Sequence, residues 1–215
     1  MMSGRTIAIG DIHGCSKALS RLIEEIQPTA DDMIVTLGDY VDRGPDSRGV
    51  IDEMLELIDR CELSPLLGNH EQMLLDAFGS EEVLTFWQGV GGDETLASYG
   101  GSLDQIPPHH NVFFRGLHRH YETDTHFFVH ANYDAELSLQ QQPDHLLLWE
   151  HIVHTRPGRH AFGKIAVVGH TPQGSGEVLD MDYVICIDTY CVGGAALDVD
   201  SGQLWQANRD GELRS

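Results

Sequence analysis

Basic residues are scarce in this chain. Its 215 residues include 13 lysines and arginines against 34 aspartates and glutamates, so the formal net charge is −21 at pH 7. A surface of that sign repels nucleic-acid backbones and anionic membranes. We therefore expect a protein whose partners are neither nucleic acids nor membranes.

Paired cysteines and long apolar runs are missing as well. Cysteines 15, 61, 186 and 191 form no CxxC pair and no disulfide-framework spacing, which favours reduced thiols. No apolar stretch is long enough to span a bilayer, and the first residues lead into a strand-like run without a signal-peptide core. These absences predict a cytoplasmic protein.

The remaining composition, 41% hydrophobic and 22% charged, is that of an ordinary globular protein. Neither a linker nor a change of pattern suggests a second folding unit. We therefore expect a single domain over residues 1–215, with the oligomeric state left open.

A recurring pattern of apolar strand and polar loop organises the chain. Runs at 6–9, 33–37 and 63–67 end in GDIHG, GDYVDRG and GNHE, and two later runs end at His130 and His170. Open α/β sheets bind their ligands at the carboxyl ends of the strands. The polar residues at these strand ends are therefore expected to form one site.

The strand ends supply two carboxylates, three imidazoles and one amide oxygen. They are Asp11, His13, Asp39, Asn69, His130 and His170. This set of oxygen and nitrogen donors, without thiolates, suits Mn²⁺, Fe or Zn²⁺ better than Ca²⁺ or a structural zinc. It is too large for one open catalytic ion and natural for two ions that share a carboxylate.

The motifs GDIHG, GDYVDRG, GNHE, a strand-end HA and VVGHTP occur in this order. With them the chain resembles the phosphoprotein phosphatase family of calcineurin-like metallophosphoesterases, in particular its compact bacterial and phage-type serine/threonine protein phosphatases. The resemblance covers nearly the whole chain. It implies an α/β (α+β, four-layer) fold in which a central β-sandwich of two mixed sheets is flanked by helices.

The resemblance also implies a metal centre and a reaction. Asp11, His13 and Asp39 match the ligands of one ion, and Asp39, Asn69, His130 and His170 match those of the other, so that Asp39 bridges the two. The expected cofactors are two divalent ions, Mn²⁺ first, with Fe or Zn²⁺ as alternatives. The expected reaction is phosphomonoester hydrolysis by direct in-line attack of a hydroxide that bridges the metals.

The catalytic and substrate-binding roles come from the same resemblance. His70 matches the general acid, Asp42 the carboxylate that orients it, and Arg43 an arginine that binds the phosphate. The residues expected on the phosphate side are Arg43, Asn69 and His151. The expected substrate is a phosphoprotein or a small phosphoester.

Three positions depart from the family pattern. Relatives commonly carry a second phosphate-binding arginine where this chain has Glu150-His151; either His151 substitutes, or Arg156 reaches in, or Arg43 binds the phosphate alone. Asn132 follows the HA pair where glycine is usual, and Tyr190 stands where glycine is frequent. These departures concern the substrate and leave the metal-ligand set complete.

Two other functions remain open. Symmetrical bis(5′-nucleosyl)-tetraphosphatases share the motifs, although they are usually longer and their polyphosphate substrate favours more basic residues than this chain has. An inactive metal-binding regulatory module is the third hypothesis. The complete ligand set together with His70, Asp42 and Arg43 argues against it.

The middle of the chain carries less information. Residues 86–93 are predicted to be a loop, followed by a short helix over 94–99. A histidine-rich tract follows, whose spacing fits neither one helix face nor one strand face, so we expect surface or packing roles for its members. They are His109, His110, His118, His120 and His126.

Overall fold

The computed structural model describes residues 4–189 and 193–214. Its first five-stranded sheet has the order β10-β9-β1-β2-β3. The three parallel strands are β1 (Thr6–Ile9), β2 (Met33–Thr36) and β3 (Glu62–Pro65), and the antiparallel strands are β9 (Gly194–Asp198) and β10 (Leu204–Ala207). The parallel strands place three polar loops at one end of this sheet.

The second five-stranded sheet has the order β4-β5-β6-β8-β7. Its central strands, β5 (His126–Val129), β6 (Ile165–Val168) and β8 (Val184–Cys186), are parallel, and its antiparallel edges are β4 (His120–Glu122) and β7 (Leu179–Asp180). Both sheets are therefore mixed.

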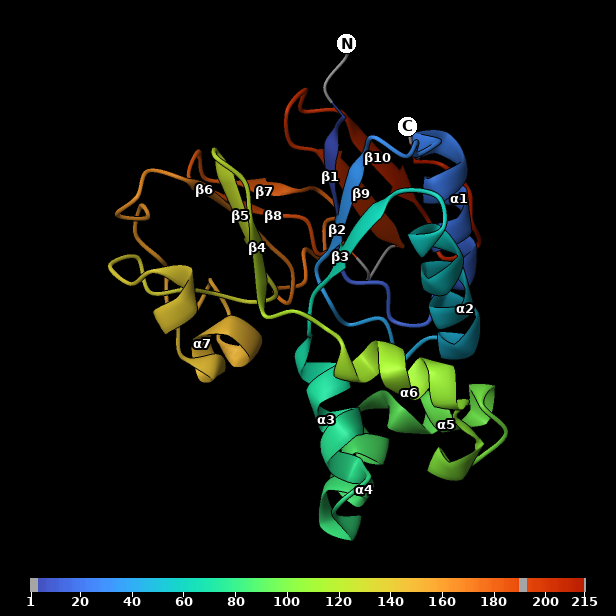
Figure 1. Ribbon diagram of the computed structural model, residues 1–215. Helices are drawn as coiled ribbons and strands as arrows, with labels where there is room; N and C mark the ends of the chain where they lie inside the picture. The colour runs from blue at the N-terminus through green and yellow to red at the C-terminus, as the bar shows by residue number, and fades with distance from the viewer. Residues whose placement is uncertain (1–3, 190–192, 215) are drawn as a thin grey trace.

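The two sheets pack face to face because each sheet carries apolar side chains on its inner face, toward the other sheet, as well as on its outer face, toward the helices. Ala8 and Val35 of the first sheet share a buried cluster with Phe128 and Val167 of the second. Helices α1 (Ser16–Ile26) and α2 (Ser47–Ile58) cover the outer face of the first sheet, and α7 (Asp144–Trp149) covers that of the second (Figure 1). The expected α/β sandwich with flanking helices is confirmed.

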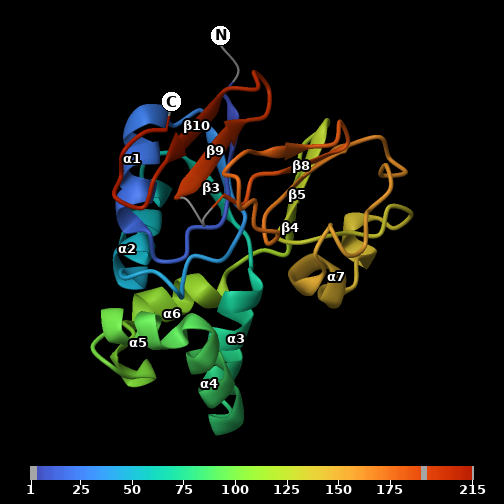
Figure 2. The ribbon, with the colours of Figure 1, turned by 180° about the vertical axis from the view of Figure 1, so that it is seen from behind.

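A group of helices lies at one end of the sandwich, below the sheets in Figures 1 and 2. It consists of α3 (Asn69–Ala77), α4 (Glu81–Trp87), a π-helical turn (Gln88–Gly92), α5 (Asp93–Ser98) and α6 (Pro108–Arg115). Short 3₁₀ turns occupy Leu103–Gln105 and Leu139–Gln141. None of the helices in the described part of the chain is long and apolar enough to cross a membrane.

The predicted loop over 86–93 is wrong for most of these residues, because α4, the π-helical turn and the start of α5 cover them, with a kink at Gly91, whose φ is 124°. Ser80 caps α4 by accepting a hydrogen bond from the backbone N–H of Val83, and burial of Trp87 anchors its end. The glycines at 89, 91 and 92 conceal this helical pattern in the sequence. The third strand also ends earlier than predicted, at Pro65, which lies on the edge strand β3.

Candidate metal centre and active site

Asp39 lies at the centre of the site, on the turn that follows β2. Gly38 has a φ of 99° and Asp39 a φ of 52°. A Cβ added at Gly38 would lie 2.7 Å from the backbone of Gly68 and 3.0 Å from Nδ1 of His130, so only glycine fits there. This close approach brings the loops after β2, β3 and β5 together around one buried carboxylate.

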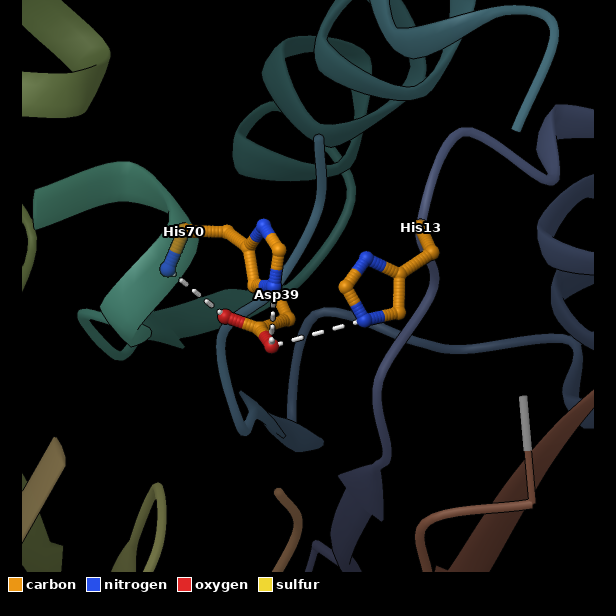
Figure 3. A group of neighbouring side chains, drawn as sticks. All are labelled: His13, Asp39 and His70. Atoms are coloured by element: carbon orange, nitrogen blue, oxygen red, sulfur yellow. Dashed lines mark hydrogen bonds and ion pairs between the residues drawn. The ribbon is translucent and has the colours of Figure 1, made fainter. Parts of the chain in front are cut away.

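The carboxylate of Asp39 faces a different imidazole with each of its oxygens. Oδ2 lies 3.4 Å from Nε2 of His13, and Oδ1 lies 3.5 Å from Nε2 of His130. The rings of His13 and His70 flank Asp39 in Figure 3. Asp39 belongs to two groups of candidate metal ligands, one with His13 and His70 and the other with His130 and His170. Within each group, the ligand atoms all lie within 4.8 Å of one another.

The orientation of three histidine rings is set by backbone carbonyls. Nδ1 of His13 donates to the Val41 carbonyl at 2.8 Å, and Nδ1 of His130 donates to the Leu37 carbonyl at 2.7 Å. Nε2 of His170 donates to the Trp149 carbonyl at 3.1 Å. The other nitrogen of each ring therefore presents a lone pair, which is the arrangement of metal-ligating histidines.

Two of those lone pairs face an oxygen atom, whereas Nε2 of His13 lies 3.1 Å from the guanidinium of Arg43. Nε2 of His130 and Nδ1 of His170 each lie 3.0 Å from Oδ1 of Asn69. Electron-pair donors at such distances repel one another unless a cation lies between them. The donor set therefore fits a divalent ion at this position, with Asp39 as the carboxylate that two ions can share.

Burial and charge prepare these groups for metal binding. Burial lowers the pKa of His13 to about 3, and burial together with His130 lowers the pKa of His170 to about 3, so both rings are neutral. Burial acts to raise the pKa of Asp39, but His130, His70 and His13 outweigh it and the net shift is downward. A neutral imidazole and an ionised carboxylate are the forms that bind metals.

Asp11 lies on the turn after β1 and is buried with 2% exposure. Its carboxylate accepts a hydrogen bond from the backbone N–H of His170 at 3.1 Å. Burial raises the pKa of Asp11 well above its ordinary value, and the nearby carboxylates of Asp188 and Asp39 raise it further. A bound cation would relieve this crowding of negative charge.

His70 stands apart from the other histidines because it is paired with a carboxylate. Its Nδ1 lies 2.5 Å from Oδ2 of Asp42, and its Nε2 lies 4.0 Å from Oδ2 of Asp39. Burial lowers the pKa of His70, but Asp39 and Asp42 outweigh it and the net shift is upward. The ring can therefore hold a proton and present it to the cavity.

Sequence reasoning missed the residues that hold Asp42. The Nε1–H of Trp87 donates to Oδ2 of Asp42 at 2.7 Å, and the hydroxyl of Thr95 donates to Oδ1 at 2.7 Å. The Ser47 hydroxyl, at the start of α2, accepts a hydrogen bond from the Asp42 backbone N–H at 3.2 Å. No motif indicated these contacts, since Trp87 and Thr95 are far from Asp42 in the chain.

Glu71 was also missed, although it belongs to the GNHE motif. Its buried carboxylate accepts hydrogen bonds from the backbone N–H groups of Asp39 (2.8 Å), Tyr40 (2.8 Å), Val41 (3.1 Å) and Gly68 (3.2 Å). It thereby joins the loop after β2 to the start of α3. This contact determines how Asp39 and His70 lie relative to each other.

A cavity of about 260 Å³ opens onto the site, and its walls contain Trp149, Pro172 and most of the candidate residues. These are Asp11, Asp39, Arg43, Asn69, His70, His151 and His170, with Asp188 beside them. Sequence reasoning also missed Asp188. Its position shortly after the strand β8, like that of the other site residues after their strands, is the signal that could have identified it. A larger cavity of about 540 Å³ lies among the helices and contains none of these residues.

The structure places His151, and neither Arg156 nor Arg159, at the cavity. The ring of His151 stacks on that of His170, with centroids 4.3 Å apart. Arg156 instead donates to the Tyr183 hydroxyl at 3.3 Å, and Arg159 lies 5.0 Å above the Tyr183 ring. Asn132 donates to the Thr155 carbonyl at 2.8 Å and so tethers the loop of His151. Tyr190 lies outside the described residues.

Comparison with known proteins identifies the class. The calcineurin-like phosphoesterase family matches residues 4–194. Serine/threonine-protein phosphatase 1 of Salmonella typhimurium is 32% identical over 197 residues, which cover 88% of this chain and 88% of that protein. The chain therefore belongs to the calcineurin-like phosphoesterase family, and it is a hydrolase of the phosphatase class.

Relatives with another substrate match as well. A symmetrical bis(5′-nucleosyl)-tetraphosphatase of Acidovorax sp. is 46% identical over 71 residues, 32% of this chain and 24% of that protein. The solved structure of a candidate diadenosine tetraphosphatase aligns with a TM-score of 0.69 and 22% identity, covering 94% of this chain and 92% of that one. At that identity the structural likeness supports the fold alone.

Proposed function

We propose that this protein is a serine/threonine protein phosphatase with two divalent metal ions bridged by Asp39. The observation that carries the proposal is the position of the Asp39 carboxylate between His13 and His130, with the paired His70 beside it. One set of ligands would be Asp11, His13 and Asp39, and the other Asp39, Asn69, His130 and His170. When bound, the two ions would supply Lewis-acid activation of water and of the phosphoryl oxygens.

The chain's own residues would perform the remaining steps. The alkoxide that leaves from serine or threonine is strongly basic and needs a proton, which His70 can deliver from Nε2 while Asp42 holds its Nδ1. Arg43 borders the cavity and can bind the phosphate with its planar guanidinium, with Asn69 and His151 on the same side. Trp87 and Thr95 keep Asp42 in place.

The relative from Salmonella typhimurium supports a phosphoprotein substrate, since the match extends over nearly the whole length of both chains. Tetraphosphatase remains the second candidate because a relative of that name is 46% identical over 71 residues of the chain. Among the residues described as lining the cavity, Arg43 alone has a permanently positive side chain. A substrate with four phosphates favours more cations than that.

We also propose which ions the protein binds and where in the cell it is located. Mn²⁺ is our first choice, with Fe or Zn²⁺ as alternatives, because the donors are imidazoles and oxygens without thiolates. Cys15, Cys61 and Cys186 are unpaired and buried, which supports a cytoplasmic protein.

Parallel kinetics on a phosphoserine peptide and on diadenosine tetraphosphate, both with added Mn²⁺, test the proposal. We expect the larger kcat/KM on the peptide. A larger value on the dinucleotide would establish the second candidate instead. Absence of hydrolysis of both, and of p-nitrophenyl phosphate, would identify an inactive metal-binding module.

A further inference from the structure

A third group of side chains that could hold a metal ion lies away from the cavity, between α2 and α6. Asp52 of α2 and His109 and His110 of α6 each offer a ligand atom, and these atoms lie within 4.8 Å of one another. Nε2 of His110 lies 3.0 Å from Oδ1 of Asp52. The rings of His109 and His110 meet edge to face, with centroids 4.5 Å apart.

The environment of His110 is that of a metal ligand. Its ring is fully buried, its Nε2–H donates to the Asp52 carboxylate at 3.0 Å, and its Nδ1 lies 2.8 Å from the hydroxyl of Tyr99; a bound cation would take the place of the Nε2 proton. An outer hydrogen bond such as that to Tyr99 orients a ligating imidazole.

The other two residues provide access from solvent. The Asp52 side chain is 51% exposed, and His109 is exposed at the start of α6. Arg48, one turn before Asp52, has its Nε 3.8 Å from the other carboxylate oxygen, too long for a strong competing bond. A simple hydrogen bond between α2 and α6 accounts for the short distance between His110 and Asp52. It does not account for the third ligand atom, that of His109, close to both.

We propose that Asp52, His109 and His110 form an additional metal site, suited to Zn²⁺, that joins α2 to α6. Two imidazoles and one carboxylate, with the fourth position left to water, are a usual zinc ligand set. Because the rings and the carboxylate come from different helices, bound zinc would link them. Tyr99 directly follows α5, the helix whose Thr95 holds Asp42, so the link extends toward the proposed acid pair.

Zinc stoichiometry tests the proposal independently of the proposed catalytic centre. The full chain is dialysed against Zn²⁺, and bound metal is measured by elemental analysis for wild type, His109→Ala, Asp52→Asn and the control His118→Ala, which removes another exposed histidine. We expect His109→Ala and Asp52→Asn each to bind one equivalent of zinc fewer than wild type, and the control to bind as much. Equal binding in all four proteins would overturn the proposal.

Amide hydrogen exchange gives a second measurement that does not depend on counting ions. Added Zn²⁺ should slow exchange in α6 of wild type and of His118→Ala but not of His109→Ala. Unchanged exchange in α6 of wild type would contradict the link between the helices. If the catalytic centre bound fewer ions than proposed, the total would fall in all four proteins while the difference between them remained, so the two failures are distinguishable.

Discussion

Two walls of the cavity at the candidate site are built differently. One wall consists of the loop after β2, with Asp39 and Arg43, and the start of α3, with His70. The Glu71 carboxylate joins the two by accepting four hydrogen bonds from backbone N–H groups. The other wall is the segment after α7, which carries His151 and is mostly exposed beyond Ile152. It is held by Asn132 at the Thr155 carbonyl and by the Thr171 hydroxyl at the Ile152 N–H.

Two of the three family departures concern the second wall. Glu150-His151 replaces the expected arginine there, and Asn132 tethers the same segment. On the proposed function, Asp39, Arg43 and His70 must hold a fixed geometry and lie on the buried, hydrogen-bonded wall, whereas His151 lies where the backbone tolerates change. Substitutions on the first wall should therefore cost much more activity than substitutions on the second.

Asp39→Asn should have the largest effect. An amide cannot serve as the shared anionic ligand, so we expect phosphatase activity at background and a reduced metal content, measured by elemental analysis after dialysis against Mn²⁺. Asp46→Asn is the matched control, because Asp46 only caps α2 through the Gly49 N–H and asparagine caps equally well. An Asp39→Asn protein with both ions and near-normal activity would refute the bridge.

His70→Asn should lower kcat by roughly 10²–10⁴-fold on a phosphoserine peptide, the usual range for loss of a general acid, while metal content stays near normal. The loss should be smaller on p-nitrophenyl phosphate, because its leaving group hardly needs a proton. Equal losses on the two substrates would remove His70 from the role of acid.

Arg43→Ala should cost about one to two decades in kcat/KM, since a hydrogen bond to a charged group contributes roughly 1.5–3 kcal/mol. Steady-state kinetics on the phosphopeptide measure this loss. Arg43→Lys, which keeps the charge but not the planar fork, should recover only part of it. Unchanged kinetics in Arg43→Ala would mean that the phosphate is bound elsewhere.

Glu71→Gln tests whether the first wall is rigid because of the buried carboxylate. Glutamine offers one acceptor oxygen and an NH₂ group that faces backbone N–H donors, so the free energy of unfolding should fall by about 1–3 kcal/mol. Urea unfolding measures this change, and the exposed Glu82→Gln on α4 is the control. Equal stability of both variants would show that the four hydrogen bonds to the Glu71 carboxylate contribute little to the free energy of unfolding.

His151→Ala should have the smallest measurable effect, about two- to tenfold in kcat/KM, as for one neutral hydrogen bond. Arg156→Ala should leave the kinetics unchanged, because Arg156 is directed at Tyr183. A large loss in Arg156→Ala would show that the segment after Trp149 rearranges when substrate binds, and the second wall would then be as important as the first.

Much of the fold was predictable because the strands are short apolar runs that end in polar turns. The runs at β1, β2, β5 and β6 have this form, and their order implied strand ends that meet. The prediction of a loop over 86–93 failed because glycines are typical of loops, whereas burial of Trp87 and the Ser80 cap make most of this segment helical. Local propensity gave way there to tertiary packing.

The sequence by itself determined the donor set of the site, because residue type and spacing after each strand are local properties of the chain. Only the tertiary structure decided which ring nitrogen of His13, His130 and His170 turns its lone pair inward, since carbonyls at Val41, Leu37 and Trp149 set those orientations. It also decided that Trp87 and Thr95 hold Asp42. These contacts join segments far apart in the chain, and they exist only once the two sheets and the helices have packed.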